Sequence, residues 1–500
     1  MNNSLKKRLL SAAMAAVMVF SLLPATAWAA MAENLPAASG QTRTEQKRGG
    51  SDTYTVTRDV KSVAAAQTGA VKKVVCLDLT TGEDQVSLDA SGGYRWVAGA
   101  NYLYLYKVQI EAEGSNALVL PAGATVEVVG KCSITGGGAN ECAVWSKGDV
   151  TVKLGQDAAL TVNGLGWRAE GNLTVAQAYD AYTGGELTVN YNGTSSDNGT
   201  SGAAIYMGGN TLCVEQGARV TANGSGIGNV KAKDSCGVKG AVYVDGGAEL
   251  TTDGGSAGST GISYGIFGSV TVKNGTVTAN GGRGLQSYGV SGDSVSVSDG
   301  GVLNANGGTA VQDLNSGIKP ISGGIYLGNN AVIENAAVNA SGGVAPCGDS
   351  FASVGLQMTS RSEVTVNSGG VLNANGGQLT NGPSANEANG FSAGINMMGA
   401  GAANLFVNGT GRVTAIGNPE RLDGGTVRSY GVNHTDMGEL TIELSGVASF
   451  KAAGGTAASR AAFTPDTVSI KGSEAYRDFD NVTDGYKFLN STYVRNDFLA

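Results

Sequence analysis

The chain has 500 residues, of which 79 are glycine and only 8 are proline. Collagen is excluded, because glycine does not recur at every third position. The formal net charge of −8 argues against nucleic acid or anionic lipid as a partner, since both need a basic surface. Abundant glycine among regular Val, Leu and Thr predicts many short strands joined by tight turns.

The first 29 residues have the features of a secretory signal peptide. A positive segment at 6–8 precedes an apolar stretch over 9–23, and the small-x-small sequence Ala27-Trp28-Ala29 fits cleavage after Ala29. The apolar stretch is short for a membrane span. No second long apolar run follows, so we predict an exported protein without a membrane span after cleavage.

Composition divides the rest of the chain into four parts. Residues 30–52, rich in Ala, Ser, Gly and Gln, are predicted to be a flexible linker. In residues 53–140, apolar and polar residues alternate as they do in strands. We predict an N-terminal cap and the first coils there, followed by repeats over 141–458. Residues 459–500 lose the repeat and gain aromatic residues. We predict a C-terminal cap there, because the open end of a repeat array exposes a sheet edge.

One phrase recurs along the repeats. It is TVNGLG at 161, VTANGSG at 220, LTTDGG at 250, VTANGG at 277, LNANGG at 303, VNASGG at 338 and LNANGG at 372. The unit is about 26 residues plus a variable insertion, a length typical of solenoids. Each unit contains three strand-like pieces separated by Gly or Asn. We therefore predict an all-β, right-handed parallel β-helix with three short strands per coil and about eleven coils.

Period-two alternation predicts which side chains face the core. Ile205 and Met207 are predicted to point inward, with Tyr206 between them pointing outward. The same pattern predicts further inward pairs: Val242 and Val244, Ile325 and Leu327, Ile395 and Met397, Val270 and Val272, Val277 and Ala279. One coil cannot bury its inward side chains alone, so we expect neighbouring coils to stack about 4.8 Å apart.

Asparagine holds the same place in several copies of the phrase: Asn163, Asn223, Asn280, Asn306 and Asn375. When coils stack, these side chains should form a hydrogen-bonded ladder at one corner. We interpret the ladder as structural.

The insertions occupy one location in the repeat. They follow the glycine phrase and precede the first strand, at 225–240, 309–322, 344–353, 378–392 and 417–429. They should therefore emerge along one edge of the solenoid, where such proteins often place binding function.

The clearest functional candidates are outward aromatic residues of the first strand: Trp145, Tyr206, Tyr243, Phe267 and Tyr326. Rings along a rigid sheet can contact the apolar C–H faces of sugars. The alternative is that these rings pack under the insertions or against one another.

Catalytic groups are sparse. The single histidine, His434, excludes a multi-histidine metal site, and alternation places it inward. A glycosidase needs two carboxylates facing one groove, whereas the acidic residues are scattered one per coil: Asp245, Asp293, Asp299, Glu334 and Glu363. We predict no enzyme activity, metal or cofactor. A lyase or hydrolase whose site is built from loops is kept as an alternative.

Six cysteines are too few for a disulfide scaffold in a chain of this length. Two interpretations remain open. Cys132 and Cys142 pair across a glycine-rich turn, or the cysteines are mainly free buried thiols.

Three segments resemble a known family: KKRLLSAAMAAVMVFSLLPATAWA, ALVLPAGATVEVVG, and coils of the form GIYLG…VLNANGG. They are similar to secreted β-helix proteins of Gram-positive gut bacteria, often described as carbohydrate-binding domain-containing proteins. The resemblance implies a pectate-lyase-like β-helix without a lyase site, secreted or at the cell surface, with polysaccharide or cell-surface glycan as partner. We predict a monomeric, non-catalytic binding protein. The alternative to polysaccharide binding is a structural adhesin that contacts host or cell-surface proteins.

Overall fold

A computed structural model describes most of residues 72–454. The gaps are 139–140, 180–183, 194–201, 226–233, 259, 313–318, 347–351, 381–389, 419–427, 435–438 and 447. Strand backbones are also described at 42–46, 53–57, 460–463, 468–471, 476–480, 486–489 and 492–495. The predicted signal peptide, 1–29, lies outside the described residues. The chain divides into two compact units, Met1–Ala70 and Val71–Ala500.

The first unit contains one described hairpin. Strand β1 (Thr42–Gln46) pairs antiparallel with β2 (Thr53–Thr57). Strand β1 falls within the range predicted to be a flexible linker, so that prediction fails for these five residues. The prediction rested on the polar composition of 30–52. It gave too little weight to the two threonines of β1, a residue type that favours strands. The rest of the predicted linker lies outside the described residues.

In the second unit, one 14-stranded sheet holds the strands that carry the recurring phrase (strand three), and every neighbouring pair in it is parallel. Its members are β3 (Lys72–Val75), β8 (Val108–Glu111), β11 (Lys131–Gly136), β14 (Ala159–Gly164), β17 (Glu186–Tyr191), β19 (Arg219–Asn223), β21 (Glu249–Asp253), β24 (Thr276–Asn280), β27 (Val302–Asn306), β30 (Ala337–Ser341), β34 (Val371–Asn375), β38 (Arg412–Ile416), β41 (Ser449–Ala453) and β44 (Tyr476–Asp480).

A 26-stranded sheet holds the first and second strands of each coil. Strand one is β4 (Leu77–Asp78), β9 (Leu118–Leu120), β12 (Val144–Ser146), β15 (Trp167–Ala169), β22 (Ile262–Phe267), β32 (Ala352–Thr359), β36 (Phe391–Met398), β39 (Arg428–His434) and β42 (Arg460–Phe463). Strand two is β7 (Tyr102–Tyr106), β10 (Ala124–Val129), β13 (Val150–Leu154), β16 (Leu173–Gln177), β23 (Val270–Lys273), β33 (Glu363–Val366), β37 (Ala402–Val407), β40 (Glu439–Leu444) and β43 (Val468–Lys471). In four coils the two are one long strand: β18 (Ala203–Glu215), β20 (Ser235–Asp245), β26 (Gln286–Ser298) and β29 (Ile321–Glu334).

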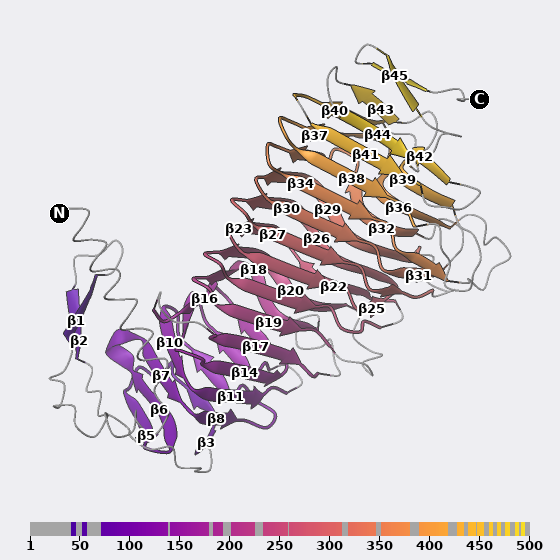
Figure 1. Cartoon of the computed structure of the whole chain (residues 1–500). Coiled ribbons are helices and arrows are strands. Elements are labelled where there is room, and N and C mark those ends of the chain that lie inside the picture. The colour runs from indigo at the N-terminus through magenta and orange to yellow at the C-terminus, as the bar shows by residue number, and fades with distance from the viewer. Residues whose placement is uncertain are drawn as a thin grey trace, which may run out of the picture. The chain divides into compact units, whose positions relative to one another are not determined.

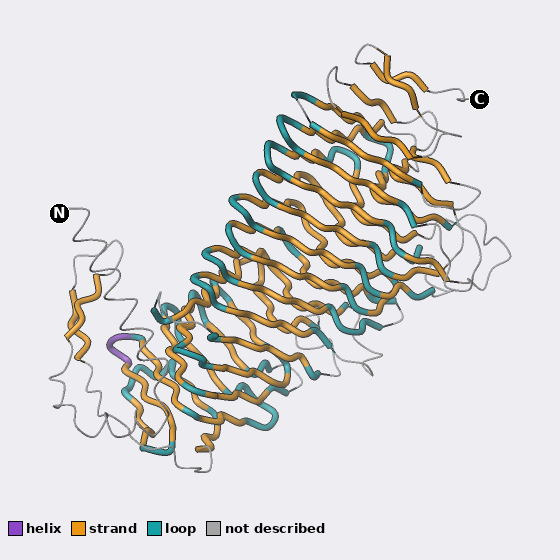
Figure 2. Tube along the Cα trace, in the orientation of Figure 1, coloured by secondary structure: helices purple, strands orange, loops and turns teal. Residues whose placement is uncertain are grey.

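The second unit is therefore a right-handed parallel β-helix, as predicted, in which each coil lies on the one before it (Figures 1 and 2). Strand three contributes 14 strands, more than the expected eleven coils, because early copies such as β3 and β8 lack the glycine phrase. At about 4.8 Å per step the stack is roughly 60 Å long.

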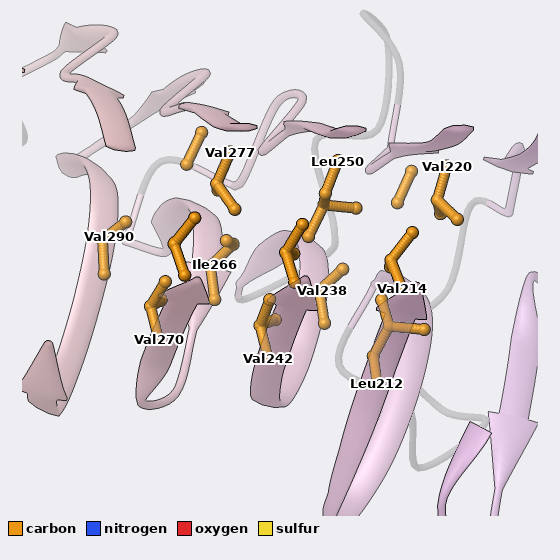
Figure 3. Close-up of a cluster of buried hydrophobic side chains, with 14 of the residues drawn as sticks. Leu212, Val214, Val220, Val238, Val242, Leu250, Ile266, Val270, Val277 and Val290 are labelled. Atoms are coloured by element: carbon orange, nitrogen blue, oxygen red, sulfur yellow. The ribbon is translucent and has the colours of Figure 1, made fainter. Parts of the chain in front are cut away.

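The core lies between the two sheets. Ile205, Val242 and Ile325 are 0%, 2% and 2% exposed, which confirms that the alternation identifies inward side chains. The other predicted inward residues are also buried. In Figure 3, side chains of strand one (Val238, Ile266), strand two (Val242, Val270) and strand three (Val220, Leu250, Val277) converge on one another. Stacked coils thus share one continuous hydrophobic core.

Asparagine ladders run along the coils. In the predicted row, Asn190 donates to Asn163 at 2.9 Å and Asn223 donates to Asn190 at 2.8 Å. Asn306 likewise donates to Asn280 at 3.0 Å. The prediction is confirmed for these neighbours. The row is interrupted at Asp253 and Ser341, and a second ladder that was not predicted joins Asn304, Asn339 and Asn373.

A column of buried serines connects strand one to the glycine phrase. Ser287 Oγ donates to the Gly282 carbonyl at 2.8 Å and accepts from the Gly308 amide of the next coil at 2.9 Å. Ser322, Ser353 and Ser392 repeat this pair of bonds. The second glycine of the phrase is required by close packing, since a Cβ on Gly308 would overlap the carbonyl oxygens of Gly281 and Gly282.

Antiparallel strands lie at both ends of the 26-stranded sheet. Near its start, β5 (Gln85–Asp89) pairs with β6 (Gly92–Val97), which pairs with β7; a short 3₁₀-helix, Ala98–Ala100, follows. Near its end, β45 (Tyr486–Leu489) pairs with β46 (Thr492–Arg495), which contacts β43. Both hairpins occupy backbone edges that would otherwise be open to pairing with another chain.

The insertions begin in register. Directly after the glycine phrase, four short strands form a parallel sheet: β25 (Arg283–Gly284), β28 (Thr309–Ala310), β31 (Val344–Pro346) and β35 (Gln378–Thr380). Ala310, Ala345 and Leu379 form a small buried cluster on it. Three of the insertions therefore leave the solenoid along one edge.

Candidate functional site

The outward side chains of strand one form a single row, here called the strand-one row. Consecutive pairs in the strand register give its members in order: Val119, Trp145, Arg168, Tyr206, Lys239, Phe267, Ser291, Tyr326, Gln357, Asn396 and Asn433. Every second member from Trp145 to Tyr326 is aromatic. The rings are therefore about 9.6 Å apart along the stack, at two coils each.

Four of the five aromatic candidates lie in this row, and Tyr243 does not. Tyr243 is opposite Cys213 and Thr271, in the outward row of strand two. In its coil, strand one supplies Val238 to the core and Lys239 to the strand-one row. The placement of Tyr243 in a first strand is therefore wrong.

The error has a local cause. The sequence AVYVD at 241 resembles AIYMG at 204, but strand one and strand two of this coil form the unbroken strand β20. The stretch 235–240 is consequently strand, although it was predicted to belong to the insertion 225–240. The sequence SCGV at 235 was the available signal, because SYGI at 263, SYGV at 287 and SAGI at 392 mark strand one in other coils.

Cations lie between the first three rings of the strand-one row, and Ser291 lies between the last two. The Lys239 ammonium is 5.8 Å from the ring centroid of Tyr206 and 5.7 Å from that of Phe267. The Arg168 guanidinium is 5.5 Å from the Trp145 ring, and Lys147 also lies over it. Cation–π attraction of this kind fixes both partners. The rings thus pack against neighbouring side chains of the row. This agrees in part with the alternative interpretation, in which the rings serve packing and not ligand binding.

A second group of aromatic residues supports the row, and the sequence analysis missed it. Tyr264 is 4.8 Å from Phe267 and 6.2 Å from Tyr288 between ring centroids, and Tyr288 is 5.5 Å from Tyr326. Together with Cys236 and Ile321 these tyrosines form a small core of their own, against which Tyr206 and Tyr326 pack. Burial raises the pKa of Tyr264 and of Tyr288 above the usual tyrosine range.

Exposure changes along the row. Phe267 is 41% exposed, and Trp145, Tyr206 and Tyr326 are partly exposed. Later members are buried: Gln357, Asn396 and Asn433 are 0%, 1% and 3% exposed. The accessible members therefore lie between Trp145 and Tyr326, from the third to the ninth of the thirteen first strands, and Ser291 among them is buried.

This accessible part combines apolar ring surface with positive charge. Trp145 Nε1 donates to Glu170 Oε1 at 3.1 Å, and Arg168 lies 3.7 Å from the same carboxylate. The contacts of these rings with Tyr264, Tyr288, Arg168 and Lys239 restrict their movement. A rigid row of rings and cations can contact an extended ligand with little loss of side-chain freedom on binding.

Other candidate chemistry is dispersed. Among the described residues, no group of three or more His, Cys, Asp or Glu side chains is placed to hold a metal ion. His434 pairs in register with the inward Met397, and its side chain lies outside the described residues. Cys132 and Cys142 are free buried thiols, so the proposed pairing between them is absent. Burial raises the pKa of the Cys142 thiol to about 11. No helix of the described residues is long and apolar enough to cross a membrane.

Comparison with known proteins identifies no family. No family model matches the chain, and no curated protein matches it. One solved structure that is similar is the TibC-catalysed hyper-glycosylated TibA55-350 fragment, at 16% sequence identity and a TM-score of 0.27. That alignment covers 74% of this chain and 92% of the fragment.

Proposed function

We propose that this protein is a secreted or cell-surface, non-catalytic binding protein for polysaccharide, and that the ligand contacts the strand-one row between Trp145 and Tyr326. One observation carries the proposal: four aromatic side chains from different coils lie in register and remain partly exposed, with Arg168 and Lys239 between the first three. Sugars offer apolar C–H faces to rings and hydroxyl oxygens to cations. The signal-like N-terminus supports an extracellular place of action.

The test is a pull-down on insoluble polysaccharides together with a glycan array. Trp145→Ala, Tyr206→Ala and Phe267→Ala each remove one ring, and an aromatic contact contributes about 0.5–1.5 kcal/mol. Each variant should therefore bind about 2- to 12-fold more weakly. Tyr243→Ala is the matched control, because Tyr243 is also a partly exposed tyrosine but lies outside the row.

Three results would redirect the proposal. Equal binding by the wild type and the three ring variants would remove the strand-one row as the contact surface. Binding to host or cell-surface proteins without any glycan binding would favour the adhesin alternative. Release of unsaturated or reducing sugar ends from pectin-like substrates would favour the lyase or hydrolase alternative.

A further inference from the structure

The outward surface of strand three is a second regular surface, on the sheet opposite the strand-one row. Over eight consecutive coils, from β14 to β34, two neighbouring rows consist almost entirely of Thr and Asn (the polar face). The first row is Thr161, Thr188, Thr221, Thr251, Thr278, Asn304, Asn339 and Asn373. The second row is Asn163, Asn190, Asn223, Asp253, Asn280, Asn306, Ser341 and Asn375.

The polar face is accessible and nearly uncharged. None of its sixteen side chains is buried, and Thr251 and Asp253 are exposed. Asp253 is its single charged member, in a chain with 33 basic and 41 acidic residues. Charged residues of strand three lie at its margin instead, where Arg219 and Glu249 form an ion pair at 3.2 Å.

Ladder hydrogen bonds hold most of the asparagine side chains of this face in position. Asn190 donates to Asn163 and accepts from Asn223, so its carboxamide is oriented by both neighbouring coils. An amide has two N–H donors and two acceptor sites, so each ladder member keeps hydrogen-bonding capacity for a ligand. The result is a flat array of donors and acceptors. It repeats about every 4.8 Å along the stack and about every 6.6 Å across it.

We propose that the polar face binds an uncharged, crystalline or fibrous polysaccharide whose own repeat lies against this array. Nucleic acid and acidic polymers need basic groups, which the two rows lack. A protein partner needs an apolar, often aromatic, centre to its interface, and the rows offer only threonine methyl groups. A neutral polymer rich in hydroxyl groups complements the face in both charge and hydrogen bonding.

The ligand must be long and ordered. A single hydrogen bond contributes only about 0.5–1.5 kcal/mol net, and association has a cost of at least several kcal/mol. Useful affinity therefore requires many contacts at once, as a solid with a regular surface provides. Short soluble oligosaccharides should bind this face poorly.

The experiment measures depletion of the full chain from solution by microcrystalline cellulose and by chitin, with cellotetraose as the soluble probe. Thr221→Lys/Thr278→Lys places two bulky charges on the face and should reduce retention at least tenfold. Thr188→Val/Thr221→Val/Thr278→Val removes three hydroxyls but keeps shape and strand preference, and should reduce retention several-fold. Thr151→Lys/Thr174→Lys is the matched control, because these threonines are outward on strand two. Circular dichroism confirms that each variant folds.

This site is separate from the strand-one row, so the two proposals can fail independently. Tyr243→Ala, which removes a ring outside both surfaces, should leave retention on cellulose or chitin unchanged. The inference is overturned if neither solid retains the wild type, or if both polar-face variants are retained like the wild type. It is also overturned if the strand-two control loses retention to the same extent, or if the chain inhibits ice growth without binding either solid.

Discussion

Ser287 is an example of a small polar side chain on which two coils depend. Its hydroxyl is completely buried and bonds to the Gly282 carbonyl and the Gly308 amide. Ser287→Ala leaves both backbone groups without a partner, which costs about 1–3 kcal/mol. We therefore expect a lower midpoint of urea unfolding. Ser296→Ala, at an outward position of strand two, should change stability by less than about 0.5 kcal/mol. Equal midpoints for the two variants would contradict a structural role for the serine column.

Individual residues show how far the sequence was informative. Ile205 and Ile325 were placed correctly because a period of two is enforced wherever one side of a strand is buried. Tyr243 was misplaced because Val242 and Val244 satisfy the same alternation in strand two as they would in strand one. Ser287 was missed because its partners, Gly282 and Gly308, belong to different coils. Contacts between coils leave no periodic hydrophobic signal.

At the scale of elements, the first strands from β20 to β26 bury three titratable side chains that favour their neutral forms. Tyr264 pairs in register with Cys236 and with Tyr288. Burial raises the pKa of Cys236 from 9.0 to about 12, and raises the pKa of both tyrosines. The contribution of these raised pKa values to the free energy of unfolding is complete below pH 9. It is lost as the pH rises from 9 towards 12, because the unfolded chain ionises first.

This linkage predicts alkaline destabilisation of up to about 1.4 kcal/mol per pH unit for each group. The measurement is urea unfolding at intervals from pH 8 to pH 11. Cys236→Ala/Tyr288→Phe should give a shallower decline than the wild type, since it removes two of the ionising groups and keeps the ring of Tyr288. For each protein, the decline is measured relative to its own free energy of unfolding at pH 7. Parallel declines for variant and wild type would show that burial of this cluster does not govern the alkaline response.

The edges and insertions were predictable in outline. Their common position between the phrase and the first strand follows from chain order, and β28, β31 and β35 show that they start in register. The hairpin of β5 and β6 was not foreseen as an element, because its pairing with β7 depends on which backbone edge is left open by the stack. The strand-one row was largely predictable because the period-two alternation that identifies the inward core residues also identifies the outward residues between them. Its supporting tyrosines were not, because they pack between coils.

At the scale of the whole molecule, each coil contacts mainly its two neighbours, so stability should be a sum of similar local terms. Residues 276–301 make up one complete coil, comprising β24, β25 and β26. Val302 pairs in register with Thr276, and Ile325 aligns with Val290, which aligns with Ile266. Removing 276–301 would therefore bring β27 against β21, and β29 against β22 and β23, with the inward rows continuous.

Deletion of 276–301 should accordingly yield a folded chain with a wild-type circular dichroism signal per residue and only a modest change in unfolding midpoint. Deletion of half a coil, 276–288, would remove β24, β25 and the start of β26, so that β23 would be followed by the rest of β26 with no third strand between them. The inward rows would then be broken, and that variant should aggregate or unfold. If the full-coil deletion failed as badly as the half-coil deletion, the coils would not be interchangeable. The alignment of outward side chains in the strand-one row and in the polar face would then depend on particular coils, and not on the repeat itself.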